Sequence, residues 1–235
     1  MASPALGIIG SGMIGGTVAR LAAAAGIDVV IGNSRGPDTL GELVDSVGPR
    51  ARAATAAEAA STGLVVVAVP LHAYDRLPVA EVSGGVVVDA MNYYPERDGH
   101  IGALDGGELT SSELVQRQLT GATVVKAFNN IDFRRLGTLA RPAGAGDRSA
   151  LPVAGDDGAA TARVVELLDR LGYDAVELGT LADSWRSRPG TPVYVQPYFP
   201  GEPPAGQDRR TWFFETPGVA VPAARVRELL ATAVR

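Results

Sequence analysis

Six residues near the N-terminus have the spacing of a phosphate-binding turn: Gly10-Ser11-Gly12-Met13-Ile14-Gly15. In this pattern the first glycine permits a tight turn, the second lets the backbone approach a pyrophosphate, and the third lets a helix pack closely on a strand. An apolar run at residues 5–9 precedes the motif, and an Ala-rich segment at 13–25 follows it. A strand, a turn and a helix N-terminus in this order predict a dinucleotide site.

The residues that follow the second predicted strand indicate which dinucleotide it is. Sites for NAD usually carry Asp or Glu there, about 20 residues after the glycines, to bind the ribose 2′-OH. This chain has Asn33, Ser34 and Arg35 instead, while Asp28 stands at the opposite end of the strand. Polar side chains beside a guanidinium suit a 2′-phosphate. We therefore predict that the cofactor is NADP(H).

Further candidate residues follow the fourth, fifth and sixth predicted strands. Ligands of open α/β sheets bind outside the carboxyl ends of the strands. Besides residues 10–15 and 33–35, the cofactor is predicted to contact Val69, Pro70, Leu71, Ala90, Met91 and Asn92. The acceptor is predicted to contact His72, Asn129, Asn130 and Trp185.

Each acceptor candidate also has an ordinary structural interpretation. His72 fits the start of a helix, and Asn129 and Asn130 fit a turn. Lys126 is the only lysine and stands inside the sixth strand, so we interpret it as structural or electrostatic. No residue is assigned with certainty as a catalytic group, and His72 and Asn129 are candidates for positioning the acceptor.

Composition removes several other kinds of chemistry. The 235 residues include no cysteine and only two histidines, and the net charge is −5. Disulfides, thiolate nucleophiles and Cys-ligated metals are therefore excluded, and no metal site is expected. An acidic chain does not favour nucleic acid as a partner. Residues 1–5 lack a basic n-region and no apolar run reaches the ~20 residues of a membrane span, so we expect a cytoplasmic protein.

Short β-branched runs alternate with Ala-rich helical stretches along most of the chain, which predicts a parallel sheet. Strands are expected at residues 5–9, 28–31, 51–54, 64–69, 86–90, 123–128, 151–154 and 173–178. Helices are expected at 13–25, 37–47, 55–60, 112–119, 159–171 and 223–234, and the polar stretch 93–107 is expected to be a loop.

The predicted fold class is α/β: a Rossmann-type, doubly wound, mostly parallel sheet with a small C-terminal αβ extension and a Pro-rich tail. Residues 1–130 form the NADP-binding domain in this interpretation. Residues 131–235 form a smaller portion that completes the acceptor site. The tail at 188–222 is rich in Pro and aromatic residues, and its role is left open.

Several strings of residues together resemble a known family. They are 10–15, 33–37 (Asn-Ser-Arg-Gly-Pro), 89–94, 124–130 (Val-Val-Lys-Ala-Phe-Asn-Asn) and 151–157. Over residues 5–185 the chain looks like the NADPH-dependent reductases of the deazaflavin coenzyme F420, most of all their actinobacterial branch. The resemblance implies direct hydride exchange between C4 of NADPH and C5 of a deazaflavin, with no obligatory protein acid or base. It also implies that Ser11 approaches the pyrophosphate or 2′-phosphate side and that Ser34 and Arg35 hold the 2′-phosphate.

Three alternatives stay open at this stage. A β-hydroxy-acid dehydrogenase would need a lysine on a C-terminal helical domain, and no lysine follows Lys126. An imine or pyrroline carboxylate reductase would need roughly 100 further helical residues. The third alternative is a non-catalytic NADP(H)-binding regulator. For the preferred interpretation we expect a small-molecule electron acceptor and a homodimer.

Overall fold

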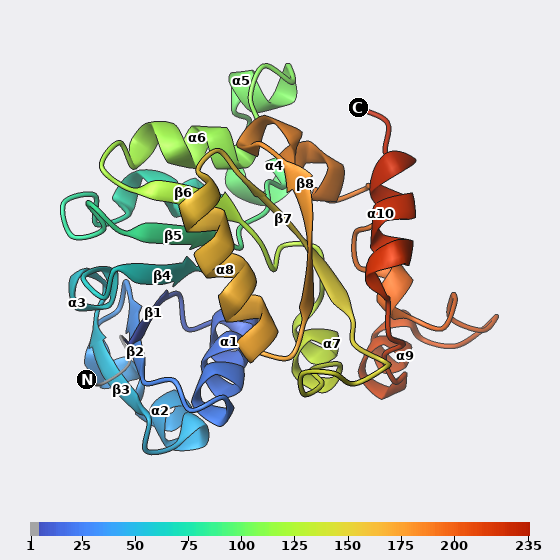
Figure 1. The fold of residues 1–235 in the computed structure, drawn as a ribbon, viewed down its shortest axis with the longest axis horizontal. Helices are drawn as coiled ribbons and strands as arrows, with labels where there is room; N and C mark the ends of the chain where they lie inside the picture. The colour runs from blue at the N-terminus through green and yellow to red at the C-terminus, as the bar shows by residue number, and fades with distance from the viewer. Residues whose placement is uncertain (1–4) are drawn as a thin grey trace.

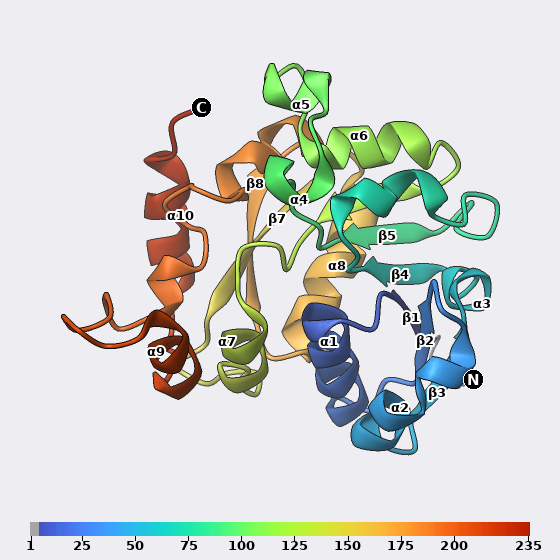
Figure 2. The ribbon, with the colours of Figure 1, turned by 180° about the vertical axis from the view of Figure 1, so that it is seen from behind.

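A single twisted sheet with helices on both faces forms the protein (Figures 1 and 2). The structure is a computed structural model that describes residues 5–235; residues 1–4, on which part of the targeting expectation rests, lie outside this range. The eight strands are ordered β3-β2-β1-β4-β5-β6-β7-β8. They are β1 (Leu6–Ile9), β2 (Val29–Asn33), β3 (Ala51–Thr55), β4 (Leu64–Val67), β5 (Val86–Asp89), β6 (Thr123–Lys126), β7 (Ala150–Gly155) and β8 (Asp174–Gly179).

The first six strands are all parallel and have the order 3-2-1-4-5-6 of a complete dinucleotide-binding sheet. The predicted Rossmann-type α/β class is therefore confirmed. β7 joins β6 in the antiparallel direction, and β8 then pairs with β7 in parallel. The residues after 130 thus extend the same sheet.

Both faces of the sheet are covered, which explains the continuous apolar runs of the strands. In β4, Val66 packs into the core on one face, whereas Val65 and Val67 pack into the core on the other. The first face is covered by α1 (Met13–Ala24), α2 (Gly41–Val47), α7 (Phe133–Thr138), α8 (Gly158–Arg170) and α10 (Ala223–Ala231). The second is covered by α3 (Ala56–Ala60), α6 (Ser111–Gln118) and the 3-10 helices η2 (Leu71–Arg76) and η3 (Leu181–Ser187).

The structure differs from the predicted elements at several places. The helix expected at 37–47 is divided into η1 (Pro37–Thr39) and α2, and the loop expected at 93–107 contains α4 (Pro95–Asp98) and α5 (Gly102–Asp105). Two α-helices outside that segment were also not predicted, α7 and α9 (Arg209–Glu215). Each begins after an aspartate, Asp132 or Asp208, whose carboxylate accepts backbone N–H groups of the first turn. These capping residues were the signal in the sequence from which the two helices could have been predicted.

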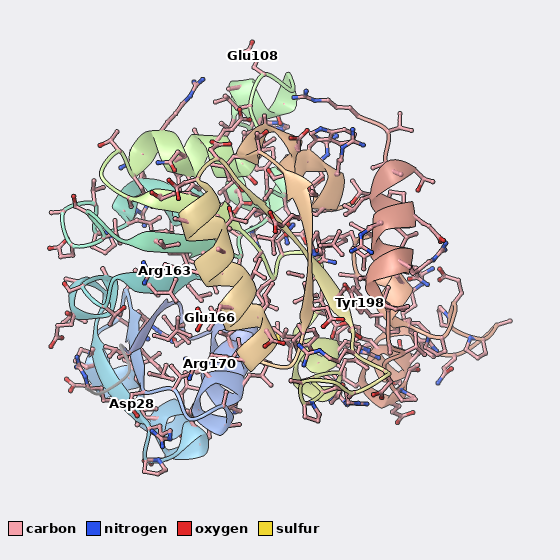
Figure 3. The ribbon with its side chains drawn as sticks, viewed as in Figure 1. Asp28, Glu108, Arg163, Glu166, Arg170 and Tyr198 are labelled. Carbon is pink, nitrogen blue, oxygen red and sulfur yellow. The ribbon has the colours of Figure 1, made fainter. Side chains whose placement is uncertain are left out.

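The Pro-rich tail folds back onto the carboxyl end of the sheet. It contains the short helix η4 (Gln196–Tyr198), and the buried Tyr198 donates a hydrogen bond to the β7 carbonyl of Ala150 at 2.9 Å (Figure 3). Helix α9 lies beside α7 in both ribbon views, and the rings of Phe133 and Phe213 are 6.1 Å apart (Figures 1 and 2). The tail is therefore part of the fold. Within residues 5–235, no helix has the length and apolar character needed to cross a membrane.

One buried ion pair fixes the ends of two central strands. Lys126 at the end of β6 and Asp89 at the end of β5 lie 3.0 Å apart, and both side chains are almost fully buried. Asp89 also accepts hydrogen bonds from Ser112 in α6 and from the Met91 backbone, and Lys126 donates to the Met91 carbonyl. Lys126 therefore has the structural role expected of it.

We expect Lys126→Met to destabilise the fold by about 3–5 kcal/mol, because it leaves a buried carboxylate without its counter-charge. The double variant Lys126→Met/Asp89→Asn should recover most of this loss, since an amide at position 89 keeps hydrogen bonds and removes the charge. Urea unfolding measures both effects. Arg225→Met is the control, because it breaks an exposed pair of the same 3.0 Å length and should cost under about 1 kcal/mol. Equal losses for the two single variants would contradict the prediction.

Candidate functional site

The glycine turn between β1 and α1 has the geometry that a pyrophosphate site needs. Gly10 has φ of 115°, and a Cβ there would lie 2.4 Å from the carbonyl oxygen of Ala68. A Cβ on Gly15 would lie 1.9 Å from the carbonyl oxygen of Gly10, so the close helix–strand contact requires glycine. A Cβ on Gly12 would meet nothing within 4 Å. The space beside Gly12 is thus free, and no side chain caps the N-terminus of α1 there.

The end of β2 presents a polar, solvent-facing edge next to this turn. The Asn33 side chain is 8% exposed and donates hydrogen bonds to the hydroxyls of Ser11 and Thr39. Its oxygen accepts the backbone N–H of Arg35 at 2.9 Å. Asn33 therefore braces the loop, while Ser34 and Arg35 are exposed. No carboxylate stands at this strand end, as the sequence indicated.

A cleft of about 560 Å³ opens at the carboxyl ends of β1, β4, β5 and β6. It lies at the position predicted for the reacting end of the cofactor. Most of the residues predicted for this region line it, namely Met13, Ile14, Val69, Pro70, Ala90, Met91, Asn92 and Asn129.

Four other predicted residues lie outside the cleft lining. Leu71 is fully buried in the core, and His72 is half exposed at the start of η2. The Asn130 side chain is fully buried and donates to the Val193 carbonyl and the Tyr198 hydroxyl. Trp185 lines a neighbouring cavity of about 280 Å³, to which Asn92 also contributes.

The opposite wall of the cleft was missed by the sequence analysis. It consists largely of residues after β6 and in the tail: Phe128, Ile131, Asp132, Phe133, Tyr194, Val195, Phe213 and Phe214. Tyr94 and Arg97 complete it from the segment after β5. The concentration of aromatic residues in the tail was the one signal that could have located this wall. The resulting cleft is mainly apolar and aromatic, which suits a flat ring.

Two strained residues form part of this wall. Phe128 has φ of 62° and Val195 has φ of 56°, and both line the cleft. The Gln196 N–H donates to the Tyr194 carbonyl at 2.6 Å across Val195, whose ψ is −53°. This is the γ-turn of positive φ, which is rare and unfavourable for a β-branched residue. Backbone strain of this kind clusters at ligand sites, because the surrounding structure must hold it in place.

Two consecutive asparagines connect the sheet to the tail. Asn129 donates to the Ser187 carbonyl at 2.8 Å and to the Asn92 side chain at 3.2 Å. Asn130 reaches Val193 and Tyr198, and its carbonyl accepts the Val195 N–H at 2.8 Å. These residues therefore fix the two cleft walls relative to one another, and only Asn129 lines the cleft itself.

A buried carboxylate holds the segment after β5. The Asp98 side chain is fully buried and accepts hydrogen bonds from the Arg97 side chain, from the backbone N–H groups of Tyr94 and His72, and from the His72 ring. Burial alone would raise the pKa of Asp98, but the hydrogen bonds from Arg97, Tyr94 and His72 outweigh it and bring the pKa to about 2. Asp98 thus links His72 to the two cleft residues Tyr94 and Arg97.

The strand order and the glycine turn define a Rossmann-type dinucleotide-binding fold. Residues 5–93 match the family model described as NADP oxidoreductase coenzyme F420-dependent. The chain is similar to the protein SMa0349 of Sinorhizobium meliloti, whose function is not assigned, at 33% identity and a TM-score of 0.72. That match covers 83% of this chain and 93% of the Sinorhizobium chain.

Two further proteins are similar to this chain. A proposed F420-dependent NADP reductase from Arthrobacter sp. FB24 is 26% identical, with a TM-score of 0.65 over 77% of this chain and 87% of that one. The Escherichia coli K12 protein YjhV is 38% identical over 79 residues, which are 34% of this chain, and the chain covers about half (54%) of YjhV. The chain belongs to the family described as NADP oxidoreductase coenzyme F420-dependent.

The Asp98 interactions predict a pH-dependent contribution to stability. Because the folded-state pKa lies below the ordinary 3.8, the contribution is fully present above about pH 4 and is lost as the pH falls toward about 2. The difference in unfolding free energy between wild type and Asp98→Asn should therefore shrink over this interval. Urea unfolding of both proteins between about pH 6 and about pH 2.5 measures it. A difference that does not change with pH would contradict this assignment.

The free space at Gly12 predicts that a side chain there blocks the cofactor without disturbing the fold. We expect Gly12→Val to abolish NADPH binding in calorimetry while the thermal midpoint stays close to that of wild type, because a Cβ at this position meets no protein atom within 4 Å. Gly146→Val is the matched control, since its Cβ also enters open space in an exposed loop. Normal NADPH binding by Gly12→Val would show that the turn does not hold the pyrophosphate.

Proposed function

We propose that the protein transfers a hydride between NADP(H) and a planar electron acceptor, with the deazaflavin coenzyme F420 as the favoured acceptor. The observation that carries the proposal is the apolar, aromatic cleft at the carboxyl ends of β1, β4, β5 and β6. Hydride transfer between two rings depends mainly on holding them in contact and in the correct orientation. A cleft with an aromatic wall opposite the strand ends is suited to this task.

In the proposed complex the cofactor extends across the strand ends. The pyrophosphate lies over Gly12 at the N-terminus of α1, where free N–H groups and the helix dipole stabilise its charge. Ser34 and Arg35 hold the 2′-phosphate at the end of β2. The nicotinamide lies beside Pro70, Met91 and Asn129, which line the cleft.

The acceptor ring would then occupy the space between the nicotinamide and the tail. The rings must approach to about 3–3.5 Å for the hydride to pass. The rings of Phe213 and Phe214 pack edge to face, with their centres 5.2 Å apart, and both residues line this side of the cleft. Both rings can pack against a flat ligand without a specific hydrogen bond. Residues 131–235 would in this way complete the acceptor site of an NADP-binding portion formed by residues 1–130.

NADPH oxidation with several acceptors tests the proposal. Coenzyme F420, 5-deazariboflavin, FMN, ferric citrate and the imine 1-pyrroline are offered in turn, and absorbance at the NADPH band is followed. We expect turnover with the deazaflavins. Turnover with 1-pyrroline alone would favour the imine reductase alternative, and tight NADPH binding without any turnover would favour a regulator.

The preference for NADP(H) generates a separate prediction. Loss of a charge-assisted hydrogen bond costs about 1.5–3 kcal/mol, so Arg35→Ala should weaken NADPH binding by roughly 10- to 100-fold. Binding of NADH, which has no 2′-phosphate, should be nearly unchanged. Arg170→Ala is the control, because Arg170 is also exposed but lies on α8 beside Ala5 and Leu6 at the start of β1, whereas the glycine turn follows the end of β1. Equal affinity of the wild type for NADPH and NADH would refute the cofactor assignment.

The homodimer and the cytoplasmic location stay predictions from the sequence. Met13 is 66% exposed and Phe214 is 40% exposed, and both line the cleft. Such apolar side chains at a cleft mouth are compatible with a covering ligand or a second subunit. Sedimentation of the purified protein with and without NADPH tests the dimer directly.

A further inference from the structure

Two tyrosine hydroxyls from distant parts of the chain meet in the aromatic wall of the cleft. Tyr94 precedes α4 and Tyr194 belongs to the tail, 100 residues later in the chain, and both line the cleft. Their hydroxyl groups form a hydrogen bond with each other. Residues 5–235 offer neither hydroxyl a second hydrogen-bond partner. Because one hydroxyl donates and the other accepts, the accepting hydroxyl keeps a proton that it can donate to a ligand.

The backbone on both sides of the pair is tightly held. The Tyr94 N–H donates to Asp98 at 2.9 Å, and the Arg97 guanidinium lies 4.8 Å from the centre of the Tyr94 ring. Tyr194 begins the γ-turn at Val195, whose N–H is bound by the Asn130 carbonyl. The strained turn at Val195 therefore positions the Tyr194 ring, and the hydrogen bond from Val195 to Asn130 stabilises that turn. Strain retained beside a ligand cleft indicates that the position of this side chain matters.

The pair is suited to donate rather than to accept a proton. Burial raises the pKa of Tyr194, and its hydrogen bond with Tyr94 raises it further. The hydroxyl therefore stays protonated at neutral pH. The nearby Asn129 amide has both of its N–H groups engaged, with Ser187 and Asn92, so it is not free to serve the ligand.

We propose that the Tyr94–Tyr194 pair donates a hydrogen bond to a carbonyl oxygen of the acceptor that is conjugated to the carbon receiving the hydride. This inference rests on the proposed function and specifies its substrate class, a planar acceptor with a conjugated C=C–C=O unit. The deazaflavin ring contains such a unit, because C5 is conjugated to a neighbouring ring carbonyl. The pair would lie on the tail side of the nicotinamide, facing the acceptor.

The chemical step is balanced without any further reactant. The C4–H bond of the dihydronicotinamide breaks with its electron pair, and a new C–H bond forms at the acceptor carbon. The π pair of the acceptor C=C bond moves to the carbonyl, whose oxygen becomes an enolate oxyanion, while NADPH is oxidised to NADP⁺. The tyrosine hydroxyl stabilises this developing charge, and a proton from solvent neutralises the reduced acceptor. Donors placed at a developing oxyanion act mainly on the transition state.

Tyrosine-to-phenylalanine variants test the proposal with 5-deazariboflavin as the acceptor and saturating NADPH. At least one of Tyr94→Phe and Tyr194→Phe should lower kcat by about 100-fold, the usual effect of removing one oxyanion donor. The double variant should stay within about threefold of the more damaged single variant, because the two hydroxyls act as one unit. The Kd for NADPH should stay within about twofold of wild type in all three proteins, which also shows that each is folded. Tyr74→Phe is the matched control, since Tyr74 lies in η2 and outside the cleft lining.

The other outcomes have distinct meanings. If wild type turns over 5-deazariboflavin and the variants keep kcat within about threefold, the pair has no role at the transition state and this inference alone is overturned. If the variants instead raise the Kd for NADPH and leave kcat unchanged, the pair contacts the cofactor and the inference is also overturned. If wild type turns over none of the acceptors offered, the proposed function fails and the inference fails with it.

Discussion

The turn after β6 is the constraint on which the cleft depends. Phe128 adopts a left-handed backbone conformation although it is fully buried, at a cost of about 1–3 kcal/mol. Asn129 and Asn130, which follow it directly, bind Ser187 at the end of η3 and Val193 and Tyr198 in the tail. This turn therefore helps to hold residues 187–198 over the strand ends.

The two halves of the cleft consequently have different origins. One wall comes from the carboxyl ends of parallel strands, where a doubly wound sheet always binds its ligand. The other wall comes from α7 and the tail, in which buried Arg135 donates to the carbonyls of Phe213 and Thr216 and contacts the rings of Phe199 and Phe213. The sheet wall is general to the fold. In the proposed function, specificity for an acceptor would arise in the aromatic wall, because its side chains line the cleft opposite the strand ends.

The sequence predicted the sheet wall well because its signals are local. The glycine spacing, the apolar strands and Asn33-Ser34-Arg35 each lie within a few residues of the feature that they report. The aromatic wall depends on contacts between residues far apart, such as Tyr94 with Tyr194, and no local pattern shows which side chains meet. The same limit explains Asn130 and Trp185. Both were predicted to contact the acceptor, but the Asn130 side chain binds the tail and Trp185 lines a neighbouring cavity. His72 was predicted to contact the acceptor, but it lies outside the cleft lining and is linked to the cleft residues Tyr94 and Arg97 only through Asp98.

Direct transfer of a label from NADPH to the acceptor tests the central claim that the cleft holds both rings in contact. NADPH carrying deuterium at C4 is oxidised by the protein in ordinary water with 5-deazariboflavin, and the reduced product is analysed by mass spectrometry. The account predicts one deuterium in the product from one of the two C4-deuterated epimers and none from the other, because a single face of the nicotinamide meets the acceptor. Product without deuterium from either epimer would contradict direct hydride transfer.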